Sequence, residues 1–452
     1  MSDGSRTLTL SAVGGAVGEG RLRQLDALRV LTCLSVVAVH AIGGPYSADS
    51  VGLGVVDSLL HYSREIFFFV SALVLVRTYV PRLGPDGRLP DESAFRRRRL
   101  RLIGMPYLWW TTIYLLIWIW HVRNTIPLSG VLSDLPLRWL YLVGTGNGCY
   151  HMYFLLVTLQ FAVVFPTLLR VLGRTQGRHD WLLAGSLVLQ IGTLAVYHWV
   201  ELPDDAWRGL IGDASLFAYQ LWLVAGALAG LYLERMHAWL VKCRVLVLGA
   251  VPVAAGLLLW CYYSQLPTRG ALGASSPLQP MMVVWTAVAL GALYLAAVSL
   301  SRLTSPLAHA VFSYGAQLSF GVYLAHPMVL DAMLSLTKRI GLGTPSPWLS
   351  ALLTVLTVAG SVLLCTGLHR TRLSLGLMGR PRLDQNVAPR LWRLWPYRRP
   401  RLNAAPTPML VALALVMLLL SSDQSPVTGS VQPSPPVTVE ADADLNPDLT
   451  GK

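Results

Sequence analysis

The feature that most constrains the fold of this chain is a succession of apolar runs, each long enough to cross a lipid bilayer. Such runs lie near residues 27–46, 60–80, 105–122, 150–172, 181–200, 214–233, 244–263, 281–300, 317–336, 348–368 and 408–422. About 20 apolar residues span the hydrocarbon core as a helix, and helices satisfy their own backbone hydrogen bonds there. With 54% of its 452 residues hydrophobic and 13% charged, the chain is predicted to be an all-α, polytopic transmembrane helical bundle of about ten core helices plus one extra C-terminal helix.

The positive charge of the chain follows this topology. The net charge of +13 comes mainly from arginines in short blocks between apolar runs, which indicates loops retained in the cytoplasm rather than a nucleic-acid-binding surface. We therefore expect a multi-pass protein of the cell (inner or plasma) membrane, in contact with membrane lipid and not with nucleic acid. Its N-terminus is expected to be cytoplasmic and its C-terminal tail extracytoplasmic.

The sequence divides into five predicted segments. Residues 1–24 form a cytoplasmic N-terminal segment, and residues 25–369 form the membrane-embedded domain. A basic cytoplasmic loop follows at 370–407, and an additional transmembrane helix at 408–422. Residues 423–452 are rich in proline and acidic residues without apolar periodicity, which predicts a disordered extracytoplasmic tail.

Ionisable residues in the first apolar run are the first sign of a site. Arg29 and His40 in "LDALRVLTCLSVVAVH" are eleven residues apart, so they share one helix face about 16 Å apart. Asp26 is three residues before Arg29 and can pair with it. A guanidinium suits phosphate recognition and an imidazole suits proton abstraction, which fits a long activated donor such as an acyl-CoA with its thioester well inside the membrane. The alternatives are a snorkelling arginine and a histidine that hydrogen-bonds between helices.

Five blocks along the chain together resemble the acyltransferase-3 family of integral membrane acyltransferases. They are "LDALRVLTCLSVVAVH", "REIFFFVSALVL", "FRRRRLRLIGMPYLWW", "YHMYFLLVTLQFAVVFP" and "SFGVYLAHPMVL", in the family's order and spacing, from about Leu25 to His369. The resemblance implies a bacterial membrane enzyme that moves an acyl group, often acetyl, from cytoplasmic acyl-CoA to hydroxyls of extracytoplasmic sugars or related acceptors.

The resemblance also implies roles for individual residues. His40 is the catalytic candidate, either as general base or as a transient carrier of the acyl group. Arg29, Arg98 and Arg101 are the donor-binding candidates, with the register of the arginine tract 96–101 left open. A purely topological role for that tract is an equal alternative. Ser71 begins a small-residue pair suited to close helix packing.

Four further residues are supporting candidates. Glu65, beside Arg64, either forms a structural ion pair or orients an imidazole such as that of His40. His151 and Tyr153 either line the acceptor site or belong to an interfacial aromatic belt. His326 matches a family position in the ninth helix and is interpreted as a polar packing or cavity residue.

The sequence therefore predicts a membrane O-acyltransferase with acyl-CoA as donor substrate, an extracytoplasmic glycan or metabolite as acceptor, and neither a metal nor a cofactor. A separate extracytoplasmic transferase is a further candidate partner. The alternatives are a transporter or flippase for a sugar, lipid or acyl-linked compound, and a noncatalytic membrane anchor for a biosynthetic complex.

Overall fold

The computed structural model describes residues 23–382 except 47–48, 125–126, 201–211, 304 and 343. Within these residues the chain forms helices and no strands. The α-helices are α2 (Arg23–Gly43), α3 (Val51–Leu60), α4 (Tyr62–Tyr79), α5 (Glu92–Arg99), α6 (Met105–Val122), α7 (Leu128–Ser133), α8 (Leu135–Thr145), α9 (Tyr153–Arg174), α10 (His179–Trp199), α12 (Gln220–Leu231), α13 (Leu233–Lys242), α14 (Arg244–Ala274), α15 (Met281–Ser301), α16 (Pro306–Arg339), α17 (Pro347–Leu368) and α18 (Ser374–Met378).

The predicted polytopic bundle is confirmed. The described residues contain nine helices or continuous helical segments long and apolar enough to cross a membrane, and ten if the bent pair Leu216–Leu231 and Leu233–Lys242 is one span. This pair is bent by 97°. The predicted segments at 1–22 and from 383 onward, including the helix at 408–422, lie outside the described residues.

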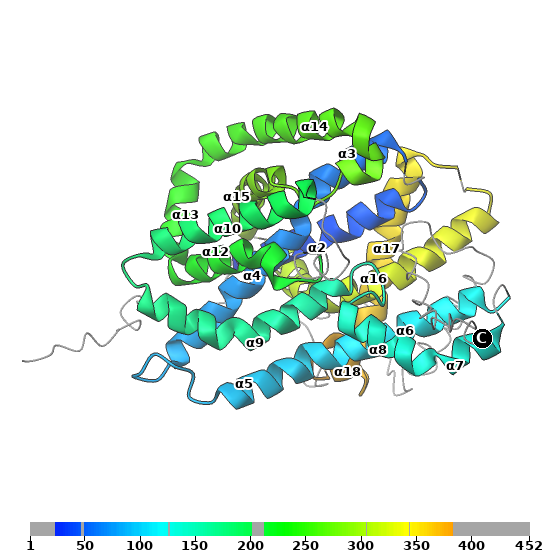
Figure 1. The fold of residues 1–452 in the computed structure, drawn as a ribbon, viewed down its shortest axis with the longest axis horizontal. Coiled ribbons are helices and arrows are strands. Elements are labelled where there is room, and N and C mark those ends of the chain that lie inside the picture. The colour runs from blue at the N-terminus through cyan, green and yellow to red at the C-terminus, as the bar shows by residue number, and fades with distance from the viewer. Residues whose placement is uncertain are drawn as a thin grey trace, which may run out of the picture.

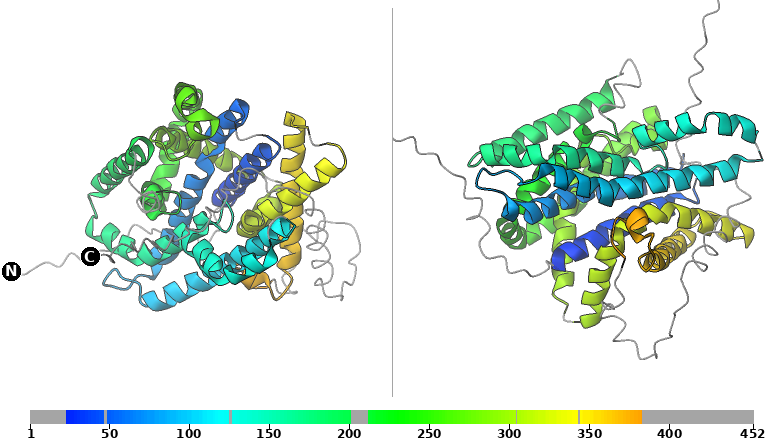
Figure 2. Two further views of the ribbon diagram at one scale, coloured as in Figure 1. Left: turned by 45° about the vertical axis from the view of Figure 1, so that its right-hand side comes forward. Right: turned by 90° about the horizontal axis from the view of Figure 1, so that it is seen from below.

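Helix α2 runs through the interior of the bundle. It packs against α3, α4, α15, α16 and α17 (Figure 1), and the turned views place it inside the ring of other helices (Figure 2). Ala27, Leu28, Val37 and Ala41 on this helix are fully buried. A helix surrounded in this way is apolar on most faces, so the few polar groups it carries are held between protein elements rather than in lipid.

The boundaries of the first two spans differ from those predicted. Helix α2 covers Arg23–Gly43 rather than 27–46, so His40 lies in its last turn and not well inside the span. The next span begins at Val51 instead of residue 60 and is divided into α3 and α4 at His61. The prediction of a start at residue 60 was wrong because residues 51–60 are at least as apolar as the run that follows them and continue the same helical span toward the N-terminus.

Close packing of α4 against α12 depends on two glycines. A Cβ atom at Gly226 would lie 2.1 Å from the carbonyl oxygen of Phe69, and one at Gly230 would lie 2.8 Å from that of Leu73. Backbones approach this closely only where a side chain is absent. On α4 itself, Ala72 is fully buried and Ser71 is half-buried.

A π-helical turn at Leu100–Gly104 joins α5 to α6, so that Glu92–Val122 forms one long span. Such turns shift the register of the helix faces on either side of them and recur at functional sites. The arginine tract lies directly before and within this turn.

Candidate active site

A cavity of about 1110 Å³ lies at the end of the bundle where α2 ends. We call this end of the molecule the His40 side. Residues of α2, α3, α4, α6, α8, α9 and α16 line the cavity, together with the loop between α8 and α9 and the segment around Asp213. The cavity thus collects side chains from most of the predicted family blocks.

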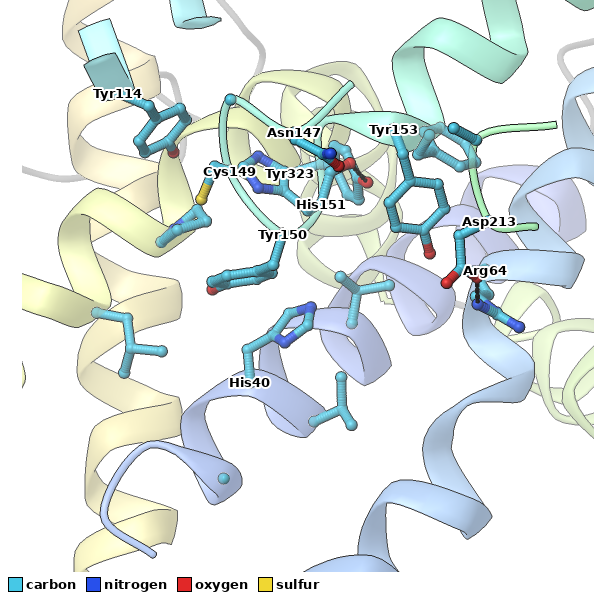
Figure 3. Close-up of a pocket in the computed structure, with 18 of the residues that line it drawn as sticks. His40, Arg64, Tyr114, Asn147, Cys149, Tyr150, His151, Tyr153, Asp213 and Tyr323 are labelled. Carbon is cyan, nitrogen blue, oxygen red and sulfur yellow. Dashed lines mark hydrogen bonds and ion pairs between the residues drawn. The ribbon is translucent and has the colours of Figure 1, made fainter. Parts of the chain in front are cut away.

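The His40 ring lies among aromatic rings from distant parts of the chain. Its centroid is 4.4 Å from that of Tyr150 and 5.4 Å from that of His326, on which it stacks. The ring of His151 is 5.2 Å from that of His326. Figure 3 shows Tyr150 directly beside His40, with His151 beyond it. We call His40, His151 and His326 the histidine group.

The direction of the His326 ring is set by the proline that follows it. Pro327 has no backbone N–H, so it leaves the carbonyl of Tyr323, four residues earlier, without its helical donor. The Nδ1 atom of His326 lies 2.7 Å from that carbonyl oxygen. A carbonyl only accepts hydrogen bonds, so Nδ1 carries the proton and, in the neutral imidazole, Nε2 has a free lone pair. This Nε2 has no hydrogen-bond partner among the described residues.

His151 is held by its backbone rather than by its ring. Its carbonyl oxygen accepts a hydrogen bond of 2.7 Å from the hydroxyl of Tyr323, while both ring nitrogens are buried without a hydrogen-bond partner in the described structure. The loop before it turns through Gly146 (φ 78°), where a Cβ would lie 2.7 Å from the Cα of Tyr153. The imidazole, 2% exposed, is thus enclosed by protein at the edge of the cavity.

Burial, and after it the neighbouring His326 and His40, lower the pKa of His151 well below its ordinary value of 6.5. The unfolded chain then binds a proton below about pH 6.5 that the folded protein does not bind, so this residue costs stability as the pH falls below that value. We expect the midpoint of thermal unfolding of His151→Gln to fall less steeply than wild type between pH 7.5 and 5, with a difference in stability of up to about 1.4 kcal/mol per pH unit. His237→Gln is the control, and parallel curves for wild type and His151→Gln would contradict the argument.

An ion cluster forms a second polar wall of the cavity. The Arg64 guanidinium donates from Nε to Glu65 at 3.0 Å and from Nη1 to Asp213 at 2.6 Å. The Tyr219 hydroxyl donates to the same Asp213 oxygen at 3.2 Å, and Tyr153, the first residue of α9, lines the cavity nearby (Figure 3). Glu65 therefore takes part in a structural ion pair, the first of its two predicted alternatives, and Arg64 connects α4 to the Asp213 segment.

Comparison with known sequences identifies the family of this membrane protein. The sequence model of the acyltransferase-3 family, described as an acyltransferase domain, matches residues 22–366. The chain belongs to the acyltransferase-3 family. A curated relative from Bacillus subtilis (strain 168), named "Putative membrane-bound acyltransferase YfiQ", is 24% identical over 318 residues, which are 68% of this chain and 80% of that protein. No solved structure matches the chain. The protein is thus a membrane-embedded, acyl-transferring enzyme.

In this acyltransferase the donor-binding candidates lie apart from the cavity. Arg29 is half-buried on α2 and, like the buried Asp26, takes part in polar or ring interactions of its own. Arg98 and Arg101 are exposed on α5 and the π-helical turn. None of the four lines the cavity. The half-buried arginine of the tract is Arg99, whose guanidinium lies 5.6 Å from the ring centroid of Tyr79 and 5.5 Å from that of Phe95.

Sequence reasoning missed several residues of the acyltransferase cavity. Tyr150 begins one of the five family blocks, but its contact with His40 could not be predicted, because it joins positions far apart in the chain. Asp213 likewise belongs to a loop whose place is set by packing. Asp57 and His61 had a usable signal: they are ionisable residues four apart in an otherwise apolar run, which marks one polar face on a membrane helix.

Proposed function

We propose that the protein transfers an acyl group, with acetyl the first candidate, from cytoplasmic acyl-CoA to a hydroxyl of an extracytoplasmic carbohydrate or related acceptor. The observation that carries this proposal is the position of His40. It lines a cavity large enough for a multi-ring acceptor, and it is on the same helix as Arg29, about 16 Å away. A donor that extends along α2 would bring its thioester toward the base of this cavity.

In the proposed reaction the His40 imidazole accepts the proton of the acceptor hydroxyl. The hydroxyl oxygen forms a bond to the thioester carbonyl carbon, the bond from that carbon to sulfur breaks, and the CoA thiolate takes up the proton from the imidazole. His326, stacked behind His40 with Nδ1 bonded to the backbone, holds the orientation of the His40 ring. Tyr150 covers the ring on another side.

The orientation in the membrane is part of the same proposal. We place the His40 side at the extracytoplasmic face and the arginine tract 96–101 at the cytoplasmic face, because arginine blocks are retained on the cytoplasmic side. The exposed Arg98 and Arg101, together with the half-buried Arg99, then meet the phosphates of acyl-CoA from the cytoplasm. The π-helical turn sets which of these guanidiniums face the bundle.

The test uses the purified full-length protein in lipid nanodiscs with radiolabelled acetyl-CoA and a panel of sugar glycosides. We expect release of free CoA thiol that depends on the acceptor, together with a labelled product that is cleaved by mild alkali, as an ester is. Vesicles containing the protein provide the contrasting assay: uptake of a glycoside without release of CoA would identify a transporter and contradict the proposal.

A further inference from the structure

The walls of the cavity carry more negative than positive groups. Three carboxylates (Asp57, Asp213 and Asp331) and two guanidiniums (Arg64 and Arg138) line it. Its other polar walls are imidazoles, hydroxyls and amides. When the histidines are neutral and all three carboxyls are ionised, the lining carries one more negative than positive charge, which disfavours an anionic acceptor and favours a neutral or cationic one.

Two of the three carboxylates already have partners. Asp213 accepts from Arg64 at 2.6 Å and from Tyr219 at 3.2 Å. Asp331 lies 3.6 Å from the Nε2 atom of His121. Both interactions join different elements of the bundle, and both carboxylates therefore have a structural explanation.

Asp57 has no ion-pair or hydrogen-bond partner for its carboxylate among the described residues. Arg64 directs Nε and Nη1 to other carboxylates, and the guanidinium of Arg138 lies 4.6 Å from the ring centroid of Trp118. The hydroxyl of Tyr262, on the neighbouring α14, donates to the backbone oxygen of Val51 at 3.0 Å. A half-buried carboxylate in a membrane span is costly, and one that is retained without a partner indicates a ligand.

The position of Asp57 relative to the catalytic candidate is defined by helix α3. Leu53, Asp57 and His61 are spaced four residues apart, so they share one face of α3 and its junction with α4, and all three line the cavity. His40, at the end of α2, lines the same cavity. One ligand that fills the cavity can therefore contact both Asp57 and His40.

The cavity also contains a second group without a protein partner. His151 is 2% exposed and lines the cavity, with both ring nitrogens unpartnered in the described structure. A ligand that fills the cavity would therefore lie beside this buried imidazole and would be expected to supply a polar group at Asp57. Tyr150 and Tyr323 also line the cavity (Figure 3), and aromatic rings of this kind are surfaces that sugars pack against.

From these observations we infer that Asp57 binds a protonated amine of the acceptor, so that the acceptor is a hydroxyl compound bearing an ammonium group, such as an amino sugar. This inference rests on the proposed function, because it concerns the acceptor of the acyl transfer. The ammonium forms a charge-assisted hydrogen bond with the Asp57 carboxylate. Since the nitrogen keeps its proton there, it is not nucleophilic, and the acyl group is transferred to a hydroxyl oxygen at His40.

The experiment compares two acceptors that differ only at one position, methyl glucosaminide and methyl glucoside, with acetyl-CoA and the full-length protein in nanodiscs. For the wild type we expect a kcat/KM about 10- to 100-fold higher for the amino glycoside, and an alkali-labile ester as product. Asp57→Asn is expected to reduce this ratio to near one. Asp134→Asn, which removes an exposed carboxylate outside the cavity, is the matched control and should keep the wild-type ratio.

The possible results of this experiment test the inference about Asp57 separately from the proposed acyl transfer. Transfer to both glycosides with equal kcat/KM, or an amide as the product, overturns the inference and leaves the acyltransferase proposal standing. Absence of acetyl transfer to every acceptor overturns both. If Asp57→Asn does not fold, the wild type alone decides: the amino glycoside should inhibit transfer to a third acceptor at a concentration at least tenfold lower than the neutral glycoside, and equal inhibition overturns the inference.

Discussion

Replacing His40 with alanine is expected to lower kcat for acyl transfer about 100- to 10,000-fold, the range over which a positioned general base acts. The imidazole lines the cavity and is fixed between Tyr150 and His326, so no neighbouring group can take its place without moving. The measurement is CoA release and ester formation by purified protein, beside acylation in cells that express the variant at the wild-type level.

The matched control for this substitution is His237→Ala. His237 is also a half-buried histidine of the bundle, but its Nδ1 is hydrogen-bonded to Tyr294 and it does not line the cavity. It should retain most of the activity. If His40→Ala and Arg29→Ala both acylate at the wild-type rate, the assignment of the α2 face to the reaction is wrong.

The second large effect is expected at Gly226, where substitution acts on folding rather than on chemistry. The Cβ of an alanine would lie 2.1 Å from the backbone oxygen of Phe69, so α4 and α12 would have to separate. Overpacking of this kind costs at least about 1–3 kcal/mol. We expect Gly226→Ala to lower the midpoint of thermal unfolding sharply and to reduce the monodisperse fraction in detergent.

The same substitution at Gly256, in the middle of α14, provides the contrast. A Cβ there has no other atom within 4 Å, and alanine is favoured over glycine in a helix interior by about 1 kcal/mol. Gly256→Ala should therefore keep or raise the midpoint. Similar losses for the two variants would show that the contact between α4 and α12 is not what limits stability.

The spans could be predicted from sequence because their cause is local. A run of apolar residues of bilayer length must be helical in lipid, and the described membrane-spanning helices follow the predicted runs with shifted ends, whereas the shorter helices α5, α7 and α8 lie in segments predicted as loops. The ends are less predictable because they depend on packing. Helix α3 is helical despite Asp57, since its face bearing Gly54 packs against Tyr262 of α14.

The residues of the site likewise divide into those whose arrangement follows from local helix geometry and those that only tertiary packing brings together. Arg29 and His40 could be paired from their spacing on one helix, because an ideal helix fixes that geometry. The neighbours of His40 could not be predicted, since Tyr150 and His326 reach it through a glycine-containing loop and another helix. The arginine tract is an intermediate case: its charge is evident from sequence, but which guanidiniums pack against the protein depends on tertiary contacts, and Arg99 lies over Tyr79 while the adjacent Arg98 is exposed.

The position of Pro327 affects how precisely the rings of His326 and His40 are oriented. Because this proline supplies no amide proton, the imidazole of His326 stands in for it and completes the hydrogen-bond ladder of α16. A side chain bonded in this way moves with the main chain of its helix, and a ring stacked against it acquires the same constraint. The His40 end of α2 is thus aligned by the backbone of a helix almost three hundred residues away in sequence, through the absence of a single hydrogen atom.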